Sequence, residues 1–301
     1  MKKQASFYES GQALVLVLLS LSVVLTMVLF VLSRSVNDIA NSTEQADSVR
    51  AFSAAEAGVE NALITGVGTN GSVTIGNASY SVDVSSYSAE STTFNYLAPM
   101  LSGDNMTLWF VSHKDDGSLT CDTSYPSCFK GNTLKVCWGT RDTSSSSNTT
   151  PAIEVSVYYE DTPGDTSTVK IARATYDPYT TRPVPNSFSA AAASLCQIDG
   201  VDYAFQNTIT LSDIGGINND GLLFAKIRML YNTTQAHSIG VSVASSGYTL
   251  PSQGLEIVST GTSSTTGGQT GQSNRRVNVF RGWPEFPLSG LAVVVPTGIT
   301  K

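Results

Sequence analysis

The sequence predicts an α+β protein, in which one long N-terminal helix leads into a mainly antiparallel β domain. Three observations predict this class. The first is an uncharged apolar run from Ala13 to Leu32. The second is a proline-free continuation to about Thr65, with apolar residues at helical steps. The third is the change after Gly66 to short alternating segments between Gly, Asn, Ser and Asp clusters, which is typical of antiparallel sheets.

The apolar run, ALVLVLLSLSVVLTMVLFVL, is long enough to cross a membrane. At about 1.5 Å per residue it forms roughly 30 Å of helix, the thickness of the hydrocarbon core of a bilayer. Ser20, Ser22 and Thr26 fit such a span, because a hydroxyl can bond to a carbonyl one turn earlier. A removable signal peptide has a shorter apolar region and an A-x-A-like cleavage site, whereas this run ends in SRS. The sequence therefore favours a retained anchor over a signal peptide or a buried soluble helix.

The charges on either side of the span predict its orientation. Lys2 and Lys3 precede it, whereas the segment after it carries Arg34 together with Asp38 and Glu44. Because positively charged flanks stay in the cytoplasm, the N-terminus is expected there. Everything after about residue 33 is then exported.

Beyond the span, the helix is expected to continue as an amphipathic rod. Apolar positions recur at steps of three or four, interrupted at Glu56: Val36, Ile39, Thr43, Ala46, Val49, Phe52, Val59 and Leu63. Small residues cluster at Ala54, Ala55, Ala57 and Gly58, and they let another backbone approach closely. Gly66 and Gly68 supply a stop signal. A helix of this length needs a partner helix or a domain to cover its stripe.

Residues 1–65 resemble the type IV pilin-like proteins. A short polar leader ends in Glu9-Ser10-Gly11, the apolar span begins at once, and the extension reads AFSAAEAGVENAL. The likeness is to minor pilins of the PilX N-terminal type, whose helix carries a phrase like A-F-x-A-A-E-A-G, here Ala51 to Gly58. The resemblance implies a prepilin leader at residues 1–11 and a helix at residues 12–65. It also implies that a prepilin peptidase cuts after Gly11, so that Gln12 becomes the mature N-terminus.

One position departs from the pattern of that family. Major pilins carry a glutamate at the fifth mature position, which falls on Leu16 here. In the family that carboxylate pairs with the N-terminal ammonium of a neighbour, and a charge at that depth is costly unless it is paired. The K-type pseudopilin of type II secretion also lacks the glutamate and lies at the filament tip. The departure therefore points to a minor or tip-like subunit.

The resemblance implies a structural role in a type IV pilus or a related filament or secretion machine. Its partners would be the membrane, the prepilin peptidase and other pilin-like subunits, which would meet the helix at Leu16, Ala54, Ala55, Glu56, Ala57 and Gly58. The chain would lie at the cell surface or in a filament. The alternative is a membrane-anchored surface adhesin or binding module, which uses the helix only as a tether and needs no cleavage after Gly11.

Residues 66–301 are expected to form the β-rich exported domain. Val73–Ile75 and Tyr80–Val84 predict a hairpin around Gly76-Asn77. Further strand candidates are Thr107–Val111, Leu134–Trp138, Ile153–Tyr159, Val169–Thr175, Leu222–Tyr231, Ile239–Val243, Leu255–Ser259, Arg276–Phe280 and Leu291–Val295. Two low-complexity stretches, Thr143–Thr150 and Ser259–Asn274, are interpreted as surface loops, the second as a long hairpin loop. The segment 183–206, with two prolines and a run of alanines, is a candidate boundary between two β subdomains.

The four cysteines predict disulfides, because an even count in a Ser/Thr-rich exported chain is typical of an oxidising compartment. Three connectivities exist for four cysteines. We favour Cys121 with Cys128, which closes a short proline-containing loop, and Cys137 with Cys196. A zinc site is the less favoured alternative, since the sequence lacks a C-x-x-C pair. Reduced, structurally inert thiols are a further alternative.

Charge argues against a nucleic-acid partner. The formal net charge is −7, the sequence pI is about 4.8, and charged residues make up 14% of the chain. Nothing resembles a basic stripe with interleaved aromatics, so no nucleic-acid partner is expected.

The sequence predicts no enzyme and no cofactor. It has only two histidines, His113 and His237, and lacks G-x-S-x-G, H-E-x-x-H, P-loop and G-x-G-x-x-G motifs. A glycosidase-type pair from Glu154, Glu160 and Asp161 is explained equally well by exposed acids at a strand end. Calcium-type loops at residues 115–118, 160–165 and 218–221 lack the spaced D-x-[DN]-x-[DN]-G pattern, so no metal is expected.

Five aromatic residues could line a ligand surface, but packing is the favoured interpretation: Trp109, Trp138, Trp283, Tyr158 and Tyr159. Trp109 and Trp138 end apolar strand candidates and are expected in the core. The segment from Phe280 to Pro284, which contains Trp283, follows the second low-complexity stretch and is the more exposed candidate.

Overall fold

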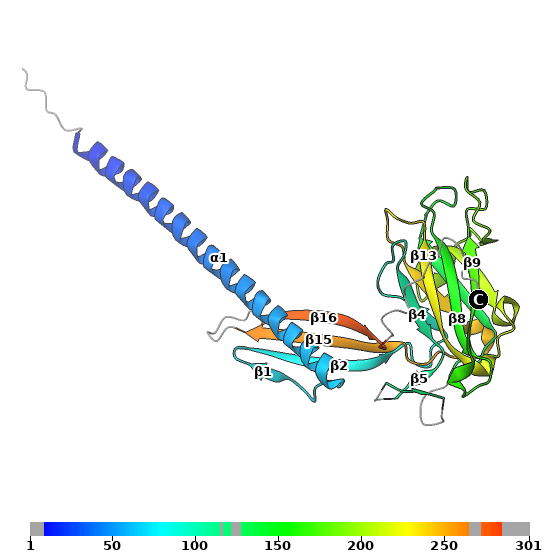
Figure 1. Cartoon of the computed structure of the whole chain (residues 1–301). Helices are drawn as coiled ribbons and strands as arrows, with labels where there is room; N and C mark the ends of the chain where they lie inside the picture. Colours follow the sequence, from blue (N-terminus) through cyan, green and yellow to red (C-terminus); the bar gives the residue numbers. More distant parts are fainter. Residues whose placement is uncertain (1–8, 115–116, 122–127, 265–271, 285–301) are drawn as a thin grey trace, which may run out of the picture. The chain divides into compact units, whose positions relative to one another are not determined.

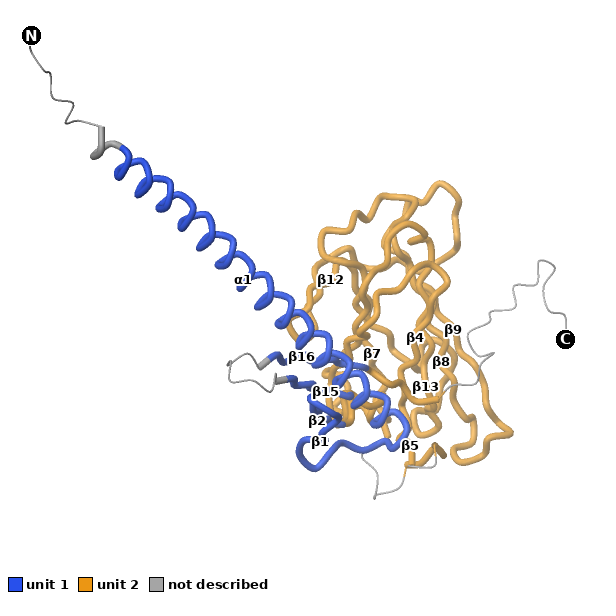
Figure 2. The backbone as a smooth tube through the Cα atoms, turned by 90° about the vertical axis from the view of Figure 1, so that its left-hand side faces the viewer, with its two compact units in different colours: residues 1–84, 257–279 blue, residues 85–256, 280–301 orange. Residues whose placement is uncertain are grey.

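The computed structural model describes residues 9–114, 117–121, 128–264 and 272–284. A long N-terminal helix is followed by strands that are mostly antiparallel, so the predicted α+β class is confirmed (Figure 1). The chain forms two compact units (Figure 2). Unit 1 consists of residues 1–84 and 257–279, and unit 2 consists of residues 85–256 and 280–301.

Helix α1 spans Glu9–Thr65 without a break, which confirms the predicted continuous helix. The hydroxyls of Ser20, Ser22 and Thr26 donate to carbonyls three residues earlier, at distances of 2.8–2.9 Å. Their polar atoms are therefore satisfied inside the helix. At the other end, the Gly66 N–H donates to the Ala62 carbonyl at 2.8 Å. Gly66 has a φ of +72°, a left-handed conformation that favours glycine and ends the helix.

Unit 1 adds a four-stranded sheet to α1. Its strands, in the order β1-β2-β15-β16, are β1 (Val73–Ile75), β2 (Ala78–Tyr87), β15 (Gly254–Ser264) and β16 (Gln272–Gly282). β1 and β2 pair in antiparallel fashion, with Ile75 opposite Ala78, so the predicted hairpin is confirmed.

The expected loop at Ser259–Asn274 is wrong at both ends. β15 continues to Ser264 and β16 already begins at Gln272, while residues 265–271 lie outside the described residues. The low-complexity composition of this stretch predicts a surface loop, whereas Ser259 and Ser263 are buried side chains of a strand. Small polar residues can therefore mark a tightly packed strand as well as a loop.

Unit 2 is a sandwich of two five-stranded sheets. One has the order β10-β9-β8-β13-β4, and the other has the order β11-β12-β7-β14-β3. A separate hairpin pairs β5 with β6. Apolar side chains from both sheets, such as Val155 and Trp138, form one buried cluster. The strands and short 3-10 helices (η) of unit 2 are β3 (Thr93–Asn95), β4 (Asn105–Trp109), β5 (Ser112–His113), β6 (Leu119–Thr120), β7 (Thr133–Thr140), β8 (Ala152–Glu160), η1 (Thr166–Thr168), β9 (Val169–Asp177), β10 (Ser189–Ala190), β11 (Cys196–Ile198), β12 (Val201–Thr210), η2 (Leu211–Ile214), η3 (Asn219–Gly221), β13 (Leu222–Leu230), β14 (Ile239–Ser242) and η4 (Ala244–Ser246).

The segment 183–206 is not a boundary between compact units. It lies wholly in unit 2, where β10 pairs with β9 and β11 pairs with β12. Just before it, Arg182 forms a buried ion pair with Asp177 at 2.7 Å and donates to the Asn148 and Thr150 carbonyls. Burial alone would raise the pKa of Asp177, but hydrogen bonds from Arg182, the Tyr179 N–H and Asn186 outweigh it and lower that pKa. The prolines therefore mark a connection within one sandwich.

Both predicted disulfides are confirmed. Cys121 is bonded to Cys128, and Cys137 on β7 is bonded to Cys196 on β11. The second cystine packs with Ile198 and Tyr203 in a small buried cluster. All four cysteines are thus used within unit 2.

Most predicted strands appear with ends shifted by a few residues, but β12 and the short strands β3, β5, β6, β10 and β11 were not predicted. The strand candidate Leu291–Val295 lies outside the described residues. β12 alternates buried Tyr203, Phe205 and Ile209 with more exposed polar residues. That alternation is present in the sequence, but the strand begins inside the segment 183–206, which was interpreted as a boundary between subdomains.

Candidate functional site

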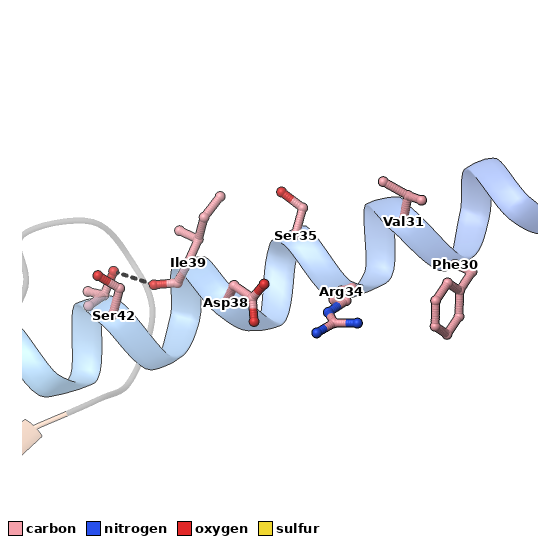
Figure 3. Close-up of a pocket in the computed structure, with 8 residues that line it drawn as sticks. Phe30, Val31, Arg34, Ser35, Asp38, Ile39 and Ser42 are labelled. Carbon is pink, nitrogen blue, oxygen red and sulfur yellow. Dashed lines mark hydrogen bonds between the residues drawn. The ribbon is translucent and has the colours of Figure 1, made fainter.

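The first half of α1 is the part of the described chain that can cross a membrane. Every large apolar side chain from Leu14 to Leu32 is exposed, on all sides of the helix. Figure 3 shows where this surface ends: Phe30 and Val31 give way to Arg34, Ser35 and Asp38 around a shallow depression on the helix. Together with the two disulfides, this helix fits a single-pass membrane protein with an oxidised exported domain.

The predicted processing residues lie at the start of this helix. Gly11 and Gln12 are both helical, two and three residues after α1 begins at Glu9. Leu16 lies one turn further and is 67% exposed. Residues 1–8 of the expected leader lie outside the described residues.

The second half of α1 is covered by the sheet of unit 1 (Figure 1). The residues of α1 that are buried there share one helix face, at steps of three and four. They are Asp47, Ala51, Ala54, Ala55, Gly58, Val59 and Ala62. Tyr80 and Val82 of β2 and Ile257 of β15 pack against this face. The sheet-facing side of α1 is therefore built largely from alanine and glycine.

The amphipathic stripe expected from the sequence is not the buried face. Val36, Ile39, Val49, Phe52 and Leu63 are all exposed, and of that stripe only Val59 is buried among the described residues. The physical reason is the separation between helix and sheet: alanine and glycine bring the backbones together, which larger side chains would prevent. A periodicity of large apolar residues therefore pointed to the wrong face.

Two glycines set this close approach. A Cβ added at Gly58 would overlap Ser259 Oγ and come within 2.8 Å of the Tyr80 ring and of Val82. A Cβ added at Gly261 would overlap the Ala51 carbonyl and lie 2.6 Å from the Ala55 N. The backbone that approaches the small-residue cluster thus belongs to β15 of the same chain.

Polar contacts fix the register of this packing. The buried Asp47 carboxylate accepts from Ser263 Oγ at 3.2 Å and from Arg50 Nη1 at 3.1 Å. Arg275 on β16 donates to Ser48 Oγ at 2.8 Å through Nε and at 2.6 Å through Nη2. These bonds hold one turn of the helix against the ends of β15 and β16.

The residues predicted for assembly in the second half of α1 differ in their exposure. Glu56 is exposed and Ala57 is half-buried, whereas Ala54, Ala55 and Gly58 are buried. Ala54 and Ala57 line a groove of about 470 Å³ between α1 and the β1–β2 hairpin, together with Val49 and Ile75. The sequence prediction missed the contribution of Ile75 and Ala78 to this surface.

The residues considered for catalysis are either buried histidines or acids with structural partners. His113 and His237 are buried, and burial lowers the pKa of both, that of His113 to about 4. Asp161 pairs with Lys170 at 2.9 Å, and Glu160 accepts from the Gly164 N–H. Glu154 lies 3.8 Å from Arg173 Nε.

The calcium-type loops contain capping and ion-pair contacts. Asp165 accepts from the Ser167 N–H and hydroxyl, and Asn218 accepts from the Asp220 N–H. Asp220 also pairs with Lys130 at 2.9 Å. In the parts of the chain that the structure describes, no three His, Cys, Asp or Glu residues gather into a potential metal site. Asp115 and Asp116 lie outside those parts.

Comparisons with protein-family models, with curated proteins and with solved structures found no match to this chain.

Proposed function

We propose that the protein is a minor or tip-like pilin-like subunit, which a prepilin peptidase cleaves after Gly11 and which enters a filament or secretion machine through α1. The observation that carries the proposal is the division of one continuous helix into two surfaces. Its first half exposes large apolar side chains all round, whereas its second half is seated on the sheet of its own chain.

This division suits a subunit that leaves the membrane. In the bilayer, lipid solvates the span from Ala13 to Leu32. Once outside, the same side chains need an apolar cover, which the helices of neighbouring subunits would supply. The small-residue face of the exported half needs no new cover during that transfer, because β2 and β15 already bury it.

The test is the mass of the mature protein made in cells with an active prepilin peptidase. Cleavage after Gly11 removes residues 1–11 and leaves Gln12 first. Gly11→Leu should block this cleavage, and Ser10→Ala is the matched control, because it changes the leader but keeps the glycine. A native protein that retains Met1 or Lys2, while a known substrate is cut in the same cells, contradicts the proposal.

An anchored binding module is the second candidate, and one observation favours it. The small-residue cluster that could meet another helix is occupied by Gly261 and its neighbours on β15. A helix that serves only as a tether needs no further surface than the span. This candidate predicts an uncleaved N-terminus and unchanged surface display in the Gly11→Leu variant.

A further inference from the structure

The first charged residues after the apolar run of α1 share one side of the helix. Arg34 and Asp38 follow Phe30 at steps of four residues, so all three lie on that side. Figure 3 shows them there, with Val31 and Ser35 in the neighbouring row. All five residues are exposed, and they line the shallow depression on α1. They are called the boundary site.

The two charges of the boundary site do not pair with each other. Arg34 and Asp38 lie about one helical turn apart. Within the residues that the structure describes, neither forms an ion pair or a side-chain hydrogen bond. Further along the same helix, in contrast, Arg50 Nη1 lies 3.1 Å from Asp47 Oδ1. The Arg34 guanidinium and the Asp38 carboxylate therefore both remain available to a ligand.

The distance of these charges from the apolar run places them at the level of the lipid headgroups. Measured along the helix from Leu32, Arg34 lies about 3 Å further and Asp38 about 9 Å further. The headgroup layer on each side of a bilayer is roughly 5–8 Å thick. Side chains of a helix lean toward its N-terminus, so both charged groups lie closer to the hydrocarbon than their α-carbons. The guanidinium is thus the inner charge and the carboxylate the outer one, whichever way the span is oriented.

This order of charges determines what kind of ligand the boundary site can bind. A guanidinium binds phosphate oxygens through two parallel N–H donors, so Arg34 suits a lipid phosphate. A carboxylate beside a layer of phosphates is repelled unless a cation meets it, and Arg34 does not pair with Asp38. A primary ammonium supplies both the positive charge and N–H donors, whereas the quaternary ammonium of a choline headgroup has no N–H. The complementary ligand therefore carries a phosphate on the inside and a primary ammonium on the outside.

We propose that the boundary site binds one phospholipid of the phosphatidylethanolamine class. Its phosphate lies on Arg34 and its ammonium lies on Asp38, while Phe30 and Val31 contact the upper part of its acyl chains. The bound lipid fixes the depth and the rotation of α1 in the membrane, because the site occupies a single side of the helix. This inference requires that α1 spans a membrane, and it does not depend on cleavage after Gly11.

The test couples the lipid to the protein. The full-length chain is placed in nanodiscs made of equal amounts of phosphatidylethanolamine and phosphatidylcholine. A water-soluble carbodiimide then joins any carboxylate to a primary amine in contact with it, and takes up the water that is lost. Peptide mapping should find phosphatidylethanolamine attached to Asp38. Arg34→Gln, at an exposed position that should not affect folding, should lower the yield of this adduct about two- to fivefold, the range expected for an exposed ion pair.

A matched control moves the carboxylate without changing the net charge. Val36→Asp combined with Asp38→Asn places it two residues closer to the hydrocarbon, about 200° around the helix from Arg34. Val36 is exposed, so the helix accepts the change. The yield of lipid adduct at position 36 should not exceed that at Asp38 in the Arg34→Gln variant.

Three results would overturn the proposal. A yield at position 36 equal to that at Asp38 in the wild type means that any carboxylate at this depth meets the bulk lipid. An unchanged yield in Arg34→Gln means that Arg34 does not hold the phosphate. Coupling of Asp38 to a lysine of another copy, in place of the lipid, identifies a second subunit as the occupant. Because the nanodiscs contain no peptidase, each result is independent of whether the protein is cleaved after Gly11 in cells.

Discussion

The two halves of α1 belong to one helix, yet they meet their surroundings in opposite ways. From Leu14 to Leu32 the helix presents large apolar side chains in every direction, which suits a fluid solvent such as lipid. From Asp47 to Ala62 it presents small side chains to a fixed partner, the sheet of unit 1. The first surface tolerates many neighbours, whereas the second tolerates only one. The difference predicts that added volume is harmless in the first half and damaging in the second.

The largest expected effect comes from Gly261→Val on β15. The new side chain would collide with the Ala51 and Ala55 backbone, so the helix must move off the sheet. We expect a loss of about 3 kcal/mol or more in the unfolding free energy of unit 1. Val23→Leu in the span is the control and should change little. Thermal unfolding in detergent measures the stability of both variants. Equal stability would contradict the claim that only the second half of α1 is sensitive to added volume.

An added charge should have the opposite pattern: it should be costly in the first half of α1 and nearly harmless on the exposed side of the second half. Leu16→Glu places a carboxylate in the lipid-exposed half, where an unpaired charge costs about 3 kcal/mol. Val49→Glu adds the same charge to the exposed side of the exported half and should cost less than about 0.5 kcal/mol. Membrane insertion of each variant can be compared by alkaline extraction. If a neighbour offers an ammonium near Leu16, the first variant inserts normally when assembly partners are present and poorly without them.

Acid should weaken unit 2 through His113. Burial lowers the folded-state pKa of this imidazole from 6.5 to about 4, so the unfolded chain binds the proton more tightly. The stability contributed by the neutral ring is complete above pH 6.5 and is lost as the pH falls toward 4, by at most about 3 kcal/mol. His113→Phe should flatten this part of the pH profile. An unchanged profile in chemical unfolding would contradict the role of His113.

The smallest expected effect in the exported half comes from substitution of Asp47. Asp47→Ala removes the acceptor of Ser263 Oγ and the partner of Arg50, and should lower the unfolding free energy by about 1–2 kcal/mol. Glu44, which is exposed on the same helix, is the matched control, and Glu44→Ala should fall within about 0.5 kcal/mol of wild type. A larger effect at Glu44 than at Asp47 would mean that the helix is seated on another face.

The sequence predicted the helix and the hairpin well because both depend on local signals. The absence of proline and the glycine at residue 66 determine where α1 runs, and Gly76-Asn77 determines the turn between β1 and β2. The face of the helix that is buried could not be predicted in the same way. It depends on Ser259, Gly261 and Ser263, which lie about 200 residues away in a stretch that reads as a loop.

The two disulfides were predicted from compartment and loop length, but the placement of Trp109 was not. Trp109 was expected in the core and is buried, yet it lies beside Phe224 on the face of the sheet that points away from the core. Only the register between β4 and β13 reveals that side, and a single strand with alternating residues does not say which face is inside.

The most direct test of the account is photo-crosslinking from two positions of α1 in the cells that assemble the protein. A photoreactive phenylalanine analogue at Leu18 should form adducts with other subunits, because this half exposes its side chains on every side. The same analogue at Phe52, which is exposed on the side of the exported half away from the sheet, tests whether neighbours reach that half as well. We predict intermolecular adducts from Leu18 that disappear when cleavage is blocked by Gly11→Leu. Adducts from Leu18 with lipid alone, whether or not Gly11 is intact, would contradict the account and identify the helix as a tether.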